Sequence, residues 1–69
     1  MDTIKISMKA ARVNANMRQE AAAKLLGISV NSLALFESGK AVPSREIAEK
    51  MASVYGIPMN NINFAQKSA

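Results

Sequence analysis

The side chains of this 69-residue chain that could do chemistry are amides, hydroxyls and basic groups, concentrated between residues 18 and 45. Asn and Gln amides donate and accept hydrogen bonds, and Lys and Arg attract anions. Groups of this kind can hold a phosphate or contact the edge of a base, as a nucleic-acid interface requires. The residues concerned are Arg18, Gln19, Ser29, Asn31, Ser32, Ser38, Lys40 and Arg45.

The same composition argues against most enzyme and metal chemistry. The chain has no Cys and no His, so it lacks the usual zinc ligands and the usual proton shuttle at neutral pH. Of its five carboxylates only Glu46 and Glu49 are close in sequence, and such a pair on a helix is typical of a solvated face. There is no glycine-rich phosphate loop of the P-loop or dinucleotide type. We therefore expect that the protein is not an enzyme and that it binds no cofactor and no metal.

The net charge of +4 belongs to the first part of the chain. Residues 1–45 hold seven basic and three acidic residues, whereas residues 46–69 hold two of each. This excess fits either a solubilising surface or a polyanionic partner. The apolar runs are too short to span a membrane, and the N-terminus lacks the layout of a secretion signal. These features predict a cytoplasmic protein.

The middle of the chain predicts two short helices joined by a tight turn, over about residues 19–26 and 30–38. Gly27 can adopt the positive φ that ends the first helix, and Ser29 can cap the second. Ala23 carries only a methyl group, which lets the two helices approach closely. This arrangement is a helix-turn-helix unit, whose second helix can dock in the major groove of DNA.

Further helical segments are expected on both sides of this unit. Ser7 and Ser44 are placed to cap two of them, and Asn16 and Gly56 can adopt the left-handed conformation that closes them. Residues 3–6 alternate polar and apolar, which indicates a short extended lead-in. The predicted segments are a helix from Ser7 to about Ala15, a helix from Ser44 to Gly56, a short turn from Met59 to about Ile62, and a frayed tail over 66–69.

Several spaced motifs extend the pattern along the chain: Lys9-Ala10-Ala11-Arg12, Gln19, Ala23 to Ser29, Leu33, Glu37-Ser38-Gly39-Lys40, Pro43-Ser44 and Tyr55-Gly56-Ile57. Together they resemble the phage-repressor/Cro-type (XRE) helix-turn-helix family, over about residues 6–62. The resemblance implies an all-α, compact four- to five-helix domain of the lambda-repressor type. We expect one domain over residues 1–69, with its core at about 6–64 and its helix-turn-helix unit at 19–38.

The resemblance also implies dimeric binding to operator DNA, with the helix over about 30–38 as the recognition helix in the major groove. Gln19 would hold a phosphate, either alone or together with a contact to a base edge. The exposed start and outer face of the recognition helix would carry Ser29, Val30, Asn31, Ser32 and Leu35, and the residues near the DNA backbone would be Ser38, Lys40 and Arg45. Such a protein would act in the bacterial cytoplasm or nucleoid, or be phage-encoded in its host.

Arg12 and Glu37 match a pair that bridges the first and third helices in this family. We expect a partly buried structural ion pair there rather than a DNA contact. Arg18 departs from the family pattern, because a capping Ser or Thr is common at its position and losing such a cap costs about 0.5–2 kcal/mol. Arg18 therefore either reaches a phosphate or is a tolerated surface residue.

The recognition helix itself carries no Lys or Arg. Asn31 is its main candidate for a bidentate contact to adenine, and Val30 and Leu35 could touch thymine methyl groups. Two functions remain open. The first is a sequence-specific, repressor-like transcriptional regulator that binds double-stranded DNA. The alternative is a protein-interaction module on the same fold, such as an antitoxin or a polymerase-contacting regulator, with Leu25, Val30 and Leu35 as its apolar patch.

A DNA-binding form is expected to be a weak homodimer that associates through its C-terminal segment. That segment contains Met59, Ile62 and Phe64, which is more apolar than a tail requires. The other interpretation is that these side chains complete the core of a single protomer, and it suits Ile62 better than Phe64.

Overall fold

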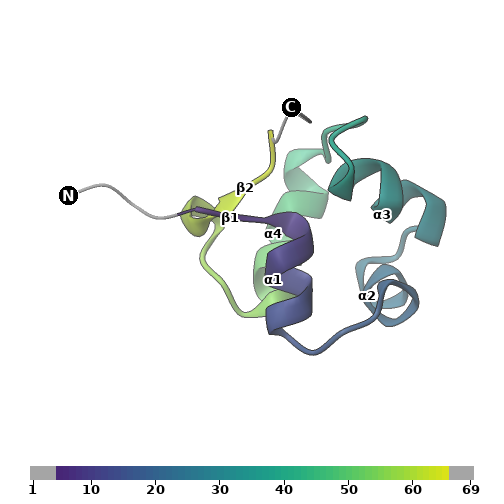
Figure 1. Cartoon of the computed structure of the whole chain (residues 1–69), viewed down its shortest axis with the longest axis horizontal. Coiled ribbons are helices and arrows are strands. Elements are labelled where there is room, and N and C mark those ends of the chain that lie inside the picture. The colour runs from purple at the N-terminus through teal and green to yellow at the C-terminus, as the bar shows by residue number, and fades with distance from the viewer. Residues whose placement is uncertain (1–4, 66–69) are drawn as a thin grey trace.

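Four α-helices surround a small apolar core in the computed structural model, which describes residues 5–65 (Figure 1). In chain order the elements are β1 (Ile6–Ser7), α1 (Met8–Asn14), α2 (Gln19–Leu26), α3 (Val30–Glu37), α4 (Arg45–Tyr55), the 3-10 helix η1 (Met59–Asn61) and β2 (Ile62–Asn63). The expected four- to five-helix architecture is therefore confirmed. Within residues 5–65 no helix is long and apolar enough to cross a membrane.

Local capping determines where the helices begin. The side chains of Ser7, Ser29 and Ser44 each accept a hydrogen bond from the backbone N–H three residues later, at 2.9, 3.0 and 3.3 Å respectively. These bonds satisfy donors that a helix start leaves unpaired. All three caps were predicted, and so were the bounds of α2.

Left-handed residues determine where the helices end. Gly27 closes α2 with a φ of 74°, and Asn16 follows α1 with a φ of 60°. A Cβ atom built on Gly27 would meet nothing within 4 Å, so the backbone conformation and not the space requires glycine there. α3 ends at Glu37, one residue earlier than predicted.

The core lies where all four helices meet. Its largest fully buried side chains are Met8, Leu26, Leu33, Met51 and Ile62. Ala22 and Ala23 are also buried, and their small side chains let α3 cross close to α2. The helix-turn-helix unit is thus fixed from behind by α1 and α4.

A short parallel strand pair joins the two ends of the described chain. Ile6 of β1 pairs with Ile62 of β2, and Ser7 pairs with Asn63. Of the extended lead-in predicted for residues 3–6, residues 3 and 4 lie outside the described residues, as does the predicted tail over 66–69. The pairing itself was not predicted.

The strand pair changes the interpretation of the C-terminal segment. Ile62 is only 2% exposed, and Phe64 packs partly buried against the same core. Ile62 therefore closes the protomer and is not available as a dimer contact, and Phe64 contributes to the core more than its sequence position suggested. Met59 remains partly exposed.

Candidate nucleic-acid interface

The turn between α2 and α3 is held by two serines. Ser29 Oγ accepts the backbone N–H of Ser32 and donates to Ser32 Oγ, both at 3.0 Å. The hydroxyl proton of Ser29 is therefore used inside the cap, whereas that of Ser32 stays available to an external acceptor. The start of α3 is therefore capped by its own side chains.

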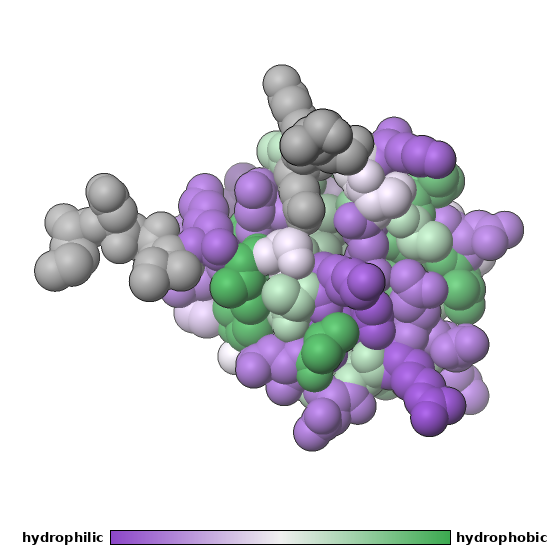
Figure 2. Space-filling model, viewed as in Figure 1, coloured by the Kyte–Doolittle hydropathy of each residue, from purple (hydrophilic) through white to green (hydrophobic). Residues whose placement is uncertain are grey.

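The outer face of α3 is open to solvent. Asn31 is exposed, and Val30 and Leu35 are 38% and 46% exposed. The side chain of Asn31 makes no hydrogen bond within residues 5–65, so its amide is free to bind an external group. Figure 2 shows hydrophobic and hydrophilic side chains interleaved over the α2–α3 side of the molecule, at the right of the view.

Arg12 and Glu37 form a buried ion pair between α1 and the end of α3. Arg12 Nε lies 2.7 Å from Glu37 Oε2, and Arg12 Nη2 donates to Glu37 Oε1 at 3.2 Å. The two side chains are 9% and 5% exposed. The hydrogen bond to Glu37 raises the pKa of the Arg12 guanidinium above its usual value, although burial acts in the opposite direction. Arg12 Nη1 also donates to the backbone oxygen of Met17 at 2.8 Å, which fixes the segment leading into α2.

Gln19 joins this network. Its Nε2 atom donates to Glu37 Oε1 at 3.0 Å, so the end of α3 orients the first side chain of α2. A Gln amide has two N–H donors and an acceptor oxygen, and this bond uses only one donor. The sequence carried no signal of this contact, because the two residues belong to different helices and only the fold brings them together.

The remaining basic and hydroxyl residues surround α2 and α3 without meeting one another. Arg18 occupies the N-cap position of α2, is exposed and makes no capping bond. The Ser38 hydroxyl donates to the backbone oxygen of Leu35 at 3.1 Å, and Lys40 is exposed in the connector after α3.

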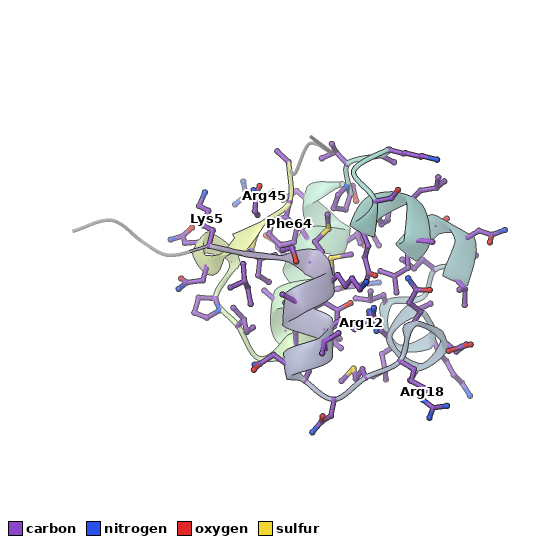
Figure 3. The ribbon with its side chains drawn as sticks, viewed as in Figure 1. Lys5, Arg12, Arg18, Arg45 and Phe64 are labelled. Carbon is purple, nitrogen blue, oxygen red and sulfur yellow. The ribbon has the colours of Figure 1, made fainter. Side chains whose placement is uncertain are left out.

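Arg45 is 85% exposed and pairs with Glu49 on its own helix at 3.2 Å. In the view of Figure 3 it lies on the side of the molecule away from Arg18. The two guanidinium groups could therefore meet one duplex only at well-separated phosphates.

Lys9 is a residue that sequence reasoning left out of the site. It lies in the first turn of α1 and lines a surface recess together with Gln19 and Glu37. No group of three or more His, Cys, Asp or Glu side chains within residues 5–65 could hold a metal ion. The arrangement is suited to hydrogen bonding and charge attraction.

Comparison with known proteins agrees with the helix-turn-helix arrangement of α2 and α3. Residues 8–62, from α1 into β2, match the family model described as helix-turn-helix. The chain is also 36% identical over 59 residues to an uncharacterised HTH-type transcriptional regulator of Methanocaldococcus jannaschii. The aligned region covers 86% of this chain and 89% of that protein. No solved structure matches the chain.

Proposed function

Because the chain belongs to the helix-turn-helix family of the phage-repressor/Cro (XRE) type, we propose that it is a sequence-specific DNA-binding transcriptional regulator with a repressor-like action. The observation that carries this proposal is the open, polar start of α3. There the free amide of Asn31 stands beside Val30 on a helix whose other side is anchored in the core by Leu33.

In the proposed complex α3 enters the major groove by its N-terminal half, while α2 crosses the DNA backbone. Asn31 contacts adenine, and Val30 and Leu35 contact thymine methyl groups. The second N–H of the Gln19 amide donates to a phosphate while Glu37 holds the first. Contacts with the sugar–phosphate backbone set the register and orientation of the protein. Besides Gln19, they are assigned to Arg18, Lys40 and Arg45. The Ser38 hydroxyl, which the sequence placed near the DNA backbone, already donates to the backbone oxygen of Leu35.

Two copies are proposed to bind each operator. One short helix with a single amide reader supplies little discrimination, and related proteins bind half-sites about 34–36 Å apart as dimers. The contact between protomers is assigned to the C-terminal segment, where Met59 and Phe64 remain partly exposed, without Ile62. The free dimer is weak, and DNA strengthens it by mass action.

Selection of bound duplexes from a random pool tests specificity and assembly together. We expect an enriched, nearly palindromic site with half-sites one helical turn apart. Sedimentation with the selected duplex should then show two protomers per DNA, and the free protein should be mostly monomeric. A protein that binds one half-site as a strict monomer would contradict the dimer, and a pool that shows no enrichment would contradict specific binding.

Replacing Asn31 by alanine tests base reading. Asn31→Ala is expected to weaken binding to the selected duplex by about 1–3 kcal/mol and to relax discrimination at one A·T pair. Asn14→Ala is the matched control, since Asn14 is an exposed amide at the end of α1 and should leave binding unchanged. Competition between the selected duplex and its single-base variants measures both effects. Unchanged sequence preference in Asn31→Ala would remove Asn31 from the readout.

The exposed apolar residues support a second candidate, a protein-interaction module such as an antitoxin or a polymerase-contacting regulator. Leu25, Val30 and Leu35 are 59%, 38% and 46% exposed, which offers an apolar surface to a partner. Salt separates the two candidates. Retention on heparin or duplex DNA that falls steeply with salt supports DNA binding, whereas salt-insensitive co-purification with one protein supports the alternative.

A further inference from the structure

A recess of about 200 Å³ opens on the surface between α1, α2 and α3. Lys9 of α1, Gln19 of α2 and Glu37 at the end of α3 contribute its polar lining, and Ala34 and Ser38 complete its wall. The recess therefore adjoins both elements proposed to contact DNA. It also includes a residue of α1 that none of the roles assigned so far has used.

The charge inside the recess is positive because its only carboxylate is already neutralised. Glu37 Oε2 accepts from Arg12, and Glu37 Oε1 accepts from both Arg12 and Gln19. Lys9 is exposed and takes part in no ion pair within residues 5–65. The ammonium group of Lys9 thus remains as the uncompensated charge beside the free N–H of the Gln19 amide.

We propose that this recess receives one backbone phosphate of the bound duplex, with Lys9 supplying the positive charge. The proposal rests on the DNA-binding function proposed above and adds α1 to the interface. The Lys side chain is a flexible point charge suited to a phosphate, and the free N–H of the Gln19 amide supplies a directed hydrogen bond. The Ser38 hydroxyl already donates to Leu35, so it forms part of the wall and is not a donor to the phosphate.

The salt dependence of binding tests this assignment. Each phosphate contact changes the slope of log K against log salt concentration by about 0.9. Lys9→Ala should make the slope shallower by that amount. The ratio of the wild-type binding constant to that of Lys9→Ala should therefore fall about 3.5-fold between 50 and 200 mM salt. Lys50→Ala is the matched control, because Lys50 is an exposed lysine of α4 that does not line the recess and its loss changes the net charge equally. Its slope should change by less than half as much.

A backbone-substituted duplex locates the contact. Single phosphates of the selected duplex are replaced in turn by neutral methylphosphonates, and the affinity of each duplex is measured for wild type, Lys9→Ala and Lys50→Ala. At one position per half-site the substitution should weaken wild-type and Lys50→Ala binding several-fold but cause little further loss in Lys9→Ala. Thermal unfolding of Lys9→Ala should match the wild type, since Lys9 is exposed.

The results separate this proposal from the function on which it rests. If wild-type protein binds the duplex and Lys9→Ala behaves like Lys50→Ala in both measurements, the recess holds no phosphate and the DNA-binding function stands. If the wild type shows no salt-dependent binding to any duplex, the proposed function fails and this assignment fails with it.

Discussion

Arg12→Ala is expected to lower the free energy of unfolding by about 3–5 kcal/mol, because it leaves a buried carboxylate without its partner. Glu37 is 5% exposed, and Arg12 supplies two of the three hydrogen bonds that its oxygens accept. The substitution also removes the donor to the backbone of Met17. Urea unfolding at neutral pH, followed by helical circular dichroism, measures the change.

The chain contains its own control for this experiment. Arg45 and Glu49 also form an Arg–carboxylate pair, but their side chains are 85% and 55% exposed. An exposed pair contributes about 0–1 kcal/mol, so Arg45→Ala should change stability little. Equal losses in Arg12→Ala and Arg45→Ala would show that burial does not set the energetic role of the Arg12–Glu37 pair.

Leu33→Ala should destabilise the protein by about 2–5 kcal/mol, because it leaves a cavity in the core. Leu33 is fully buried, whereas Leu35, on the same helix, is 46% exposed. Leu35→Ala should therefore leave the free energy of unfolding almost unchanged. A loss of about 2–5 kcal/mol is a large part of the total stability of a domain this small.

The same two variants separate folding from binding. At a temperature where both are folded, Leu33→Ala should bind the selected duplex nearly as well as the wild type, and Leu35→Ala should bind it less well. Urea unfolding and duplex titration measure the two properties independently. A Leu33→Ala protein of wild-type stability would contradict the assignment of Leu33 to the core, and unchanged binding by Leu35→Ala would remove Leu35 from the interface.

The helices could be predicted from the sequence because their limits depend on neighbouring residues. A serine cap such as Ser44 acts through a hydrogen bond three residues away, and Gly27 ends α2 through its own backbone conformation. The exposed start of α3 was predictable for the same reason, since helical periodicity places the buried Leu33 and the exposed Asn31 on opposite faces. These properties require no knowledge of what lies across the fold.

Contacts between distant segments could not be predicted in this way. The pairing of Ile6 with Ile62, the bond from Gln19 to Glu37 and the position of Lys9 beside that bond all depend on how complete elements pack. The pairing of Arg12 with Glu37 was expected only from the resemblance to a family, because taken alone each residue reads as an ordinary surface charge. The part of the candidate interface on α3 was thus predictable, whereas the recess to which α1 contributes Lys9 was not.

The strand pair has a consequence for the order of folding. Helices form through local contacts, whereas β1 and β2 can meet only after nearly the whole described chain has been brought into place. Joining them closes a loop that spans nearly all of residues 5–65, and the entropy of that closure must be overcome before the two-residue ladder gains anything in return. We therefore expect the pair to form late, after the helices have assembled. The ladder also contains only two residue pairs, so it opens more easily than a helix, and amide exchange should be faster at Ile62 and Asn63 than in the buried turns of α2 and α3.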